Sequence, residues 1–246
     1  MDPQVVLVHG IRTSATMWRP QVEHLQDAGV AVHAIDLPGH GSRIDEEWAL
    51  DEALASIDRA VASAASAGPV VLVGHSMGGL LTTAYVGRAG CAPPVAAFVA
   101  FSCTAFPRGP GLAAYRILSR GVQRLPGQGM GVVRLALAAQ LPVESRDVFA
   151  AGGYALAAED QALASLAGLD LVRPLARIQK RAMPVWFANG EFDQLRLNER
   201  AFTRLVPRAE LVVVPRATHL VTAMRPRVAN AVIDLAVATV RAGATW

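Results

Sequence analysis

Short runs of apolar residues alternate along the chain with longer segments whose apolar positions lie three or four residues apart. The runs are rich in β-branched residues, and they predict buried strands at residues 5–8, 30–36, 70–73, 95–101, 184–190 and 210–214. The longer segments predict helices at residues 18–28, 47–66, 77–88 and 228–241. We therefore expect an α/β fold with a mostly parallel sheet of about six strands, flanked by helices on both faces.

This alternation stops between residues 102 and 175. The stretch contains several prolines and glycines, and its apolar spacing predicts helices near residues 112–125, 130–141, 144–151 and 155–167. It contains no predicted strand. We therefore expect residues 1–101 and 176–246 to form the core, and residues 102–175 to form a helical cap, or lid, over the functional edge of the sheet.

Composition narrows the class of protein. A chain of 246 residues, 52% hydrophobic and 17% charged, is large enough for one α/β domain with an extensive core. The net charge is only +3 and the arginines are scattered, with Lys180 as the single lysine, so nucleic-acid binding is not expected. Cys91 and Cys103 make no disulfide framework, and no metal-ligand spacing occurs, so neither a cofactor nor a metal is expected.

The start of the chain bears on its location. Met1-Asp2-Pro3 runs directly into the first predicted strand, which leaves no room for a signal peptide, and no apolar run reaches transmembrane length. We expect a soluble cytoplasmic protein without stable membrane insertion. The pattern carries no signal of the oligomeric state.

The segment Gly74-His75-Ser76-Met77-Gly78 follows the strand predicted at residues 70–73 and precedes a predicted helix. A strand that turns directly into a helix strains the residue at the corner and brings two backbone segments close, so only glycine fits at positions 74 and 78. Ser76 would then sit on the corner with its hydroxyl exposed. The backbone N–H of Met77 would point at an oxyanion formed beside that serine.

A serine hydroxyl needs a general base, and six histidines compete for that role. Five of them are expected to have structural roles, in a helix, in a strand, in tight turns or beside the serine but pointing away from it: His24, His33, His9, His40 and His75. His219 differs because it lies in a loop after a predicted strand, at the carboxyl edge of the sheet. His219 is therefore the predicted base.

A carboxylate must orient the base, and two acids follow the strand predicted at residues 184–190. Asp193 is the better candidate, because Gly190 lets the chain turn and the more distant carboxylate can reach under the loop. Glu191 is a rival, and Asp170 is a weaker third candidate because it lies in the insertion. The order serine, aspartate, histidine is one of three known for such a triad.

The chain resembles the α/β-hydrolase fold superfamily from end to end, in its serine esterase and lipase-like branch. The matching segments are the strand ending in His9-Gly10, Asp36-Leu37-Pro38-Gly39-His40-Gly41, Gly74-His75-Ser76-Met77-Gly78-Gly79, Gly190-Glu191-Phe192-Asp193 and Thr218-His219. The resemblance implies Ser76 as nucleophile, Asp193 as acid and His219 as base. It also implies that Ile11, which follows His-Gly, supplies a second oxyanion N–H beside that of Met77.

The resemblance also indicates where this chain differs from other members of the family. The chain begins at the family's third strand, which implies a minimal sheet of six strands. Ser42 follows Pro-Gly-His-Gly directly, where family members often have a spacer or a charged residue, so the detail of that loop differs. A serine at the elbow argues against the dehalogenase and epoxide-hydrolase branches, which use aspartate there.

These residues predict a serine hydrolase that cleaves a carboxylic ester of a small hydrophobic substrate through an acyl-enzyme. Thioesters and lactones are further candidate substrates, and the same triad can hydrolyse a carbon–carbon bond. A different class of function also stays open. Proteins of this fold can bind small molecules or act as interaction modules without catalysis.

The predicted cap helix at residues 112–125 carries Arg116, Arg120 and Arg124 four residues apart, so they share one helix face. One interpretation is a lid helix with a solvated charged face above an apolar underside. The other is that this face meets an anionic surface or an acidic acyl carrier. The sequence does not decide between them.

Overall fold

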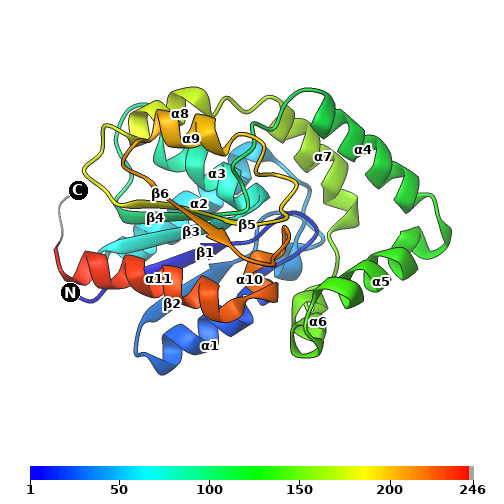
Figure 1. The fold of residues 1–246 in the computed structure, drawn as a ribbon, viewed down its shortest axis with the longest axis horizontal. Helices are drawn as coiled ribbons and strands as arrows, with labels where there is room; N and C mark the ends of the chain where they lie inside the picture. Colours follow the sequence, from blue (N-terminus) through cyan, green and yellow to red (C-terminus); the bar gives the residue numbers. More distant parts are fainter. Residues whose placement is uncertain (244–246) are drawn as a thin grey trace.

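A parallel sheet of six strands runs through the computed structural model, which describes residues 1–243 (Figure 1). In spatial order the strands are β2 (Ala31–Ile35), β1 (Gln4–Val8), β3 (Val70–His75), β4 (Val95–Phe101), β5 (Val185–Gly190) and β6 (Glu210–Val214). Every neighbouring pair is parallel. The predicted α/β class and the predicted six strands are confirmed.

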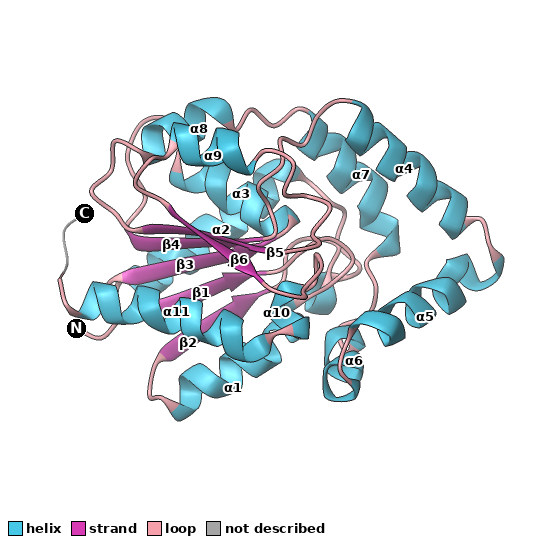
Figure 2. Ribbon diagram, in the orientation of Figure 1, coloured by secondary structure: helices cyan, strands magenta, loops and turns pink. Residues whose placement is uncertain are grey.

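Helices cover both faces of the sheet (Figure 2). Successive side chains of a strand point to opposite faces, so Val6 and Val8 of β1 enter one apolar core while Val5 and Leu7 enter the other. The first core is closed by α2 (Leu50–Ala65), α3 (Met77–Val86), α8 (Val172–Ile178) and α9 (Glu199–Leu205). The second core is closed by α1 (Arg19–Asp27), α10 (Val221–Met224) and α11 (Pro226–Arg241).

The insertion is helical, as predicted. It consists of α4 (Pro110–Gln123), α5 (Met130–Gln140), α6 (Val143–Ala150) and α7 (Leu156–Ala167), which lie beyond the carboxyl ends of the strands (Figure 1). Leu175 and Ile178 of α8 are buried in the sheet's core, so residues 172–175 lie in a helix of the core layer. The division of the chain into core and cap at residues 102 and 175 stays a prediction.

The arginines of α4 have a partner in the structure. Arg116 and Arg120 both bind Asp160 of α7, with N–O distances of 3.1 and 2.8 Å. These hydrogen bonds, first that of Arg120 and then that of Arg116, hold the pKa of the Asp160 carboxyl below its usual value. Arg124 is exposed. Two of the three basic side chains are therefore engaged within the insertion itself, and neither interpretation of this face is tested by these contacts.

Three further properties follow from the described part of the chain. None of the helices within residues 1–243 combines the length and the hydrophobicity that crossing a bilayer requires. Cys91 is exposed and Cys103 is buried, and both are free thiols. Over the same residues, no three histidine, cysteine or acidic side chains come close enough together to hold a metal ion.

Candidate active site

Ser76 occupies the sharp turn between β3 and α3. Its backbone has φ 54° and ψ −119°, in the left-handed half of the map that side chains rarely enter. A Cβ on Gly74 would lie 2.6 Å from the carbonyl oxygen of Gly78, and a Cβ on Gly78 would lie 2.5 Å from that of Val8. Both positions require glycine because backbone passes that close, as the sequence predicted.

Ser76, His219 and Asp193 form a continuous hydrogen-bonded chain. His219 Nε2 lies 2.8 Å from Ser76 Oγ, and His219 Nδ1 lies 3.0 Å from Asp193 Oδ1. The acid follows β5 and the histidine follows β6, and a Cβ on Gly190 would lie only 2.2 Å from the carbonyl oxygen of Thr218. The glycine lets the two loops pack closely enough for their side chains to meet.

The Asp193 carboxyl is buried, and its surroundings favour the ionised form. Burial alone would raise its pKa, but the hydrogen bond and charge of His219, followed by the N–H of Leu195 at 2.8 Å, hold the pKa below its usual value. The Ser102 hydroxyl contributes to this lowering. Ser102 directly follows β4 and has φ 53°. The sequence analysis missed Ser102, although its place at the carboxyl end of a strand was a usable signal.

The two rival acids lie elsewhere. Glu191 is exposed, and its Oε2 accepts the backbone N–H of Arg216 at 2.9 Å. Asp170 accepts the N–H of Val172 at 3.0 Å at the start of α8 and lies 3.7 Å from the Arg173 guanidinium. The structure therefore brings Asp193 to His219 and gives Glu191 and Asp170 local structural roles.

The predicted oxyanion donors lie on adjacent strands. Val8 of β1 pairs with Gly74 of β3, so the loop after β1 runs beside Ser76, and a Cβ on Gly10 would lie 3.2 Å from Ser76 Cβ. Met77 is the first residue of α3, where a backbone N–H has no acceptor within the helix. Its N–H group is therefore available to an oxyanion beside Ser76.

The Ile11 N–H belongs to the peptide unit whose carbonyl is that of Gly10. That carbonyl oxygen accepts the Thr13 hydroxyl at 2.8 Å and lies 2.8 Å from His9 Nδ1. In a trans peptide the N–H and the C=O point in opposite directions. His9 and Thr13 therefore hold the carbonyl end of this peptide unit.

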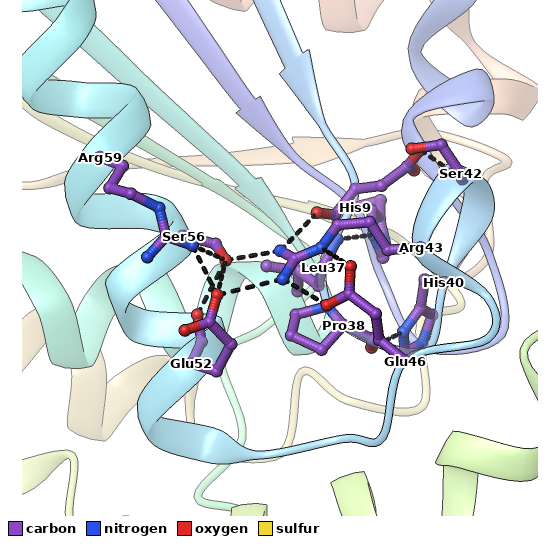
Figure 3. A network of polar contacts seen from close by, with 11 residues as sticks. His9, Leu37, Pro38, His40, Ser42, Arg43, Glu46, Glu52, Ser56 and Arg59 are labelled. Atoms are coloured by element: carbon purple, nitrogen blue, oxygen red, sulfur yellow. Dashed lines mark hydrogen bonds and ion pairs between the residues drawn. The ribbon is translucent and has the colours of Figure 1, made fainter.

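His9 is a neutral structural histidine, as predicted. Its Nε2 accepts the backbone N–H of Leu37 at 3.0 Å, which leaves the proton on Nδ1 (Figure 3). Burial, followed by the nearby His40, lowers the pKa of His9 to about 3. His40 Nδ1 lies 2.8 Å from the Pro38 carbonyl oxygen in the neighbouring turn. The loops after β1 and β2 are joined by these contacts.

His75 lies against the loop that carries His219, and its direction away from Ser76 stays a prediction. Its ring lies 5.2 Å from the ring of His219, and its Nε2 donates to the His219 backbone carbonyl at 2.9 Å. The loop after β6 therefore packs against the His75 side chain. Burial, followed by the charge of His219, lowers the pKa of His75 to about 3. His75 is therefore a neutral support for the backbone of His219.

The buried histidines make stability depend on pH. The pKa of His75 falls from 6.5 to about 3 on folding. At pH values between these two, His75 is therefore protonated in the unfolded chain and neutral in the folded chain. The free energy of unfolding should therefore fall as the pH falls, by about 1 kcal/mol per pH unit from this residue between about pH 6 and pH 5. Urea unfolding of the wild type and of His75→Gln measures this share as the difference between their slopes.

His33→Gln is the control for this experiment, because His33 lies exposed on β2. The slope of His33→Gln is the baseline against which the slope of His75→Gln is compared. Equal slopes in wild type and His75→Gln would contradict the assignment of His75 as a histidine that is buried in its neutral form.

A parallel sheet in this order, with its polar side chains gathered at the carboxyl ends of the strands, is the architecture of α/β hydrolases. The chain belongs to the alpha/beta hydrolase family, whose sequence profile matches residues 5–231.

Curated relatives match only part of the chain. It is 39% identical over 82 residues to (E)-2-((N-methylformamido)methylene)succinate hydrolase of Acinetobacter baylyi, which covers 32% of this chain and 30% of the relative. It is 41% identical over 78 residues to the probable esterase PIR7A of Oryza sativa subsp. indica, which covers 30% of each. The chain thus matches about a third of the length of these relatives.

The fold is similar over nearly the whole chain to that of a solved structure, a thermophilic esterase from Thermogutta terrifontis. The two superpose with a TM-score of 0.72 at 24% identity, over 96% of this chain and 89% of the esterase. At this identity the similarity concerns the fold, which the two proteins share over nearly the whole chain.

Proposed function

We propose that this protein is a serine hydrolase that cleaves the carboxylic ester of a small hydrophobic substrate. The observation that carries the proposal is the hydrogen-bonded chain from Ser76 Oγ through His219 to the buried Asp193. A hydroxyl within 2.8 Å of an imidazole nitrogen can transfer its proton as it attacks a carbonyl. Ser76 is then the nucleophile, His219 the general base and Asp193 the acid that orients it.

The reaction has two halves. In the first, His219 Nε2 takes the proton of Ser76, the Oγ attacks the acyl carbon, and the N–H groups of Ile11 and Met77 bind the resulting oxyanion. His219 then gives its proton to the departing alcohol, which leaves the acyl group on Ser76. In the second half, His219 takes a proton from water, and the hydroxide attacks the acyl-enzyme. Return of the proton to Ser76 releases the carboxylic acid.

The surroundings of Ser76 support a small, apolar acyl group. Ser76 is only 6% exposed, and in this proposal the helices α4 to α7 act as the lid that admits a substrate to it. Phe192 and Leu197 flank the loop of Asp193, and their apolar side chains are largely exposed. A probable esterase and a succinate-derivative hydrolase among the relatives are consistent with acyl hydrolysis.

Hydrolysis of a graded set of esters tests this proposal. The protein should cleave nitrophenyl acetate, butyrate and octanoate faster than the palmitate, because a long chain must be accommodated beneath the lid. A thioester and a lactone with the best acyl group then measure the preference among leaving groups. Cleavage of a β-diketone without cleavage of any ester would instead assign a carbon–carbon hydrolase.

If the protein binds small molecules without catalysis, we expect the opposite result in these assays. It would cleave none of these compounds, and a fluorophosphonate would leave Ser76 unlabelled. The complete triad disfavours this alternative, because loss of catalysis in a fold of this kind is expected to leave at least one triad member replaced.

A further inference from the structure

Arg12 joins the loop after β1 to the insertion. It directly follows Ile11, and its backbone has φ 60°, a left-handed conformation for a residue with a side chain. One terminal nitrogen of its guanidinium donates to Ser119 Oγ of α4 at 2.7 Å and to Glu159 Oε2 of α7 at 2.6 Å. A single side chain therefore connects the loop after β1, which carries the proposed oxyanion donor Ile11 and is called the oxyanion loop below, with two helices of the lid.

Glu159 is the buried partner in this connection. Its side chain is 1% exposed and that of Arg12 is 18% exposed, so the pair lies at the buried junction between insertion and core. Gln123 of α4 also donates to Glu159 Oε2. Within residues 1–243, Glu159 Oε1 and Arg12 Nε have no hydrogen-bond partner. A buried charge with so few partners depends on each one, and removing one leaves the other charge uncompensated.

The strained backbone of Arg12 needs support from outside the loop. A left-handed residue with a side chain persists only where its surroundings hold it. The Gly10 carbonyl is fixed by Thr13 and His9 within the core. Arg12, on the other side of Ile11, is held by Ser119 and Glu159 of the lid. Ile11 is therefore fixed from both sides only while α4 and α7 are seated on the core.

We propose that the Arg12–Glu159 ion pair positions the Ile11 N–H, so that the oxyanion hole is complete only when the lid is seated. This inference rests on the proposed hydrolase function and deepens it, because it couples substrate admission to transition-state stabilisation. Arg12 is a positioning residue that acts through Ile11. A lifted lid would separate Arg12 from Glu159 and Ser119 and leave the oxyanion with the Met77 donor alone.

A purely structural ion pair gives a different kinetic result. It would affect the amount of folded protein and leave the turnover of each folded molecule unchanged. A positioning role lowers kcat and leaves KM nearly unchanged, because the oxyanion interaction is made only in the transition state. It also weakens inhibitors that form an oxyanion on the serine.

The experiment compares Arg12→Met with Arg43→Met. Arg43 is a matched control because its ion pair with Glu46 is also 2.6 Å long and its side chain is 23% exposed, but its partners lie within residues 36–56 and not in the insertion. For Arg12→Met we expect kcat on a short ester to fall about tenfold to a hundredfold, because removal of a whole oxyanion donor costs about a hundredfold to a thousandfold. Affinity for an alkyl trifluoromethyl ketone, which adds to Ser76 as a hemiketal oxyanion, should fall by the same factor. Arg43→Met should keep both values.

Two further variants keep the test decisive. Arg12→Ala should regain part of its kcat when guanidinium ion is added, because the free ion can occupy the space beside Glu159. If Arg12→Met does not fold, Glu159→Gln replaces it, since it keeps an acceptor for Arg12. Its kcat should fall severalfold without a change in KM.

The proposal is overturned if the kcat of folded Arg12→Met equals that of wild type, if the loss lies in KM, or if Arg43→Met loses as much. Failure of the hydrolase function itself looks different, because the wild type would then be inert toward esters and fluorophosphonate. Hydrogen exchange tests the coupling even in that case. Peptides covering residues 10–17 should exchange faster in Arg12→Met than in Arg43→Met, and equal exchange would contradict it.

Discussion

Replacing Ser76 with alanine should reduce ester hydrolysis about a million-fold while the fold stays intact, because the substitution removes the proposed nucleophile and little else. The side chain makes one hydrogen bond, to His219 Nε2 at 2.8 Å. The corner itself is enforced by the close backbone contacts at Gly74 and Gly78, which the substitution does not touch. The residual rate would come from the oxyanion donors and substrate binding alone.

Three measurements check this result together: turnover of a short nitrophenyl ester, the thermal unfolding midpoint, and labelling by a fluorophosphonate followed by peptide mapping. Ser42→Ala is the control, because Ser42 lies in the loop after β2 and its hydroxyl binds Asp36. This control should keep its activity and its label. A label on another residue, or undiminished turnover in Ser76→Ala, would refute Ser76 as the nucleophile.

Asp193→Asn should lower kcat about ten-thousandfold, whereas Glu191→Gln should change it little. Asp193 accepts the Nδ1 proton of His219, which leaves Nε2 free to take the proton of Ser76. An asparagine can instead donate to Nδ1, and this selects the tautomer that carries its proton on Nε2. An amide also cannot stabilise the imidazolium that forms during attack.

The matched pair makes this a test between two neighbouring acids. Glu191 lies two positions away, but its carboxylate accepts the N–H of Arg216 and is exposed. The measurement is kcat for both variants at one saturating ester concentration, with unfolding curves to verify the fold. If Glu191→Gln is the more damaged variant, the orienting role belongs to Glu191. Small and equal losses would show that neither carboxylate orients His219.

Local sequence determined the elements of the sheet and its sharp turn. Continuous β-branched runs predict strands that are buried on both faces, and β4 (Val95–Phe101) and β6 (Glu210–Val214) have the predicted bounds. Gly74 and Gly78 predict the sharp turn at Ser76, because no residue with a side chain tolerates backbone atoms at 2.5–2.6 Å from its Cβ. The short helices α8 (Val172–Ile178), α9 (Glu199–Leu205) and α10 (Val221–Met224) were not predicted, because seven or four residues give too few turns for a periodic pattern.

The partners of each side chain were decided by the tertiary structure. Ser76 and His219 are 143 residues apart, and only the order of strands in the sheet brings them within hydrogen-bond distance. The choice between Glu191 and Asp193 depends on the turn after Gly190, where the loop packs against that of Thr218. Local pattern cannot fix either contact, because residues near in sequence can face opposite sides of one loop.

Packing between distant segments also explains why the sequence did not indicate the roles of His75, Arg12 and Glu159. His75 supports the backbone of His219 only because the loop after β6 folds over it. Arg12 and Glu159 are 147 residues apart, and each alone looks like an ordinary charged residue. Their burial and pairing arise when the insertion packs on the core. Apolar periodicity and glycine thus determined the scaffold and the proposed nucleophile, whereas packing between distant segments decided the environment in which that nucleophile would work.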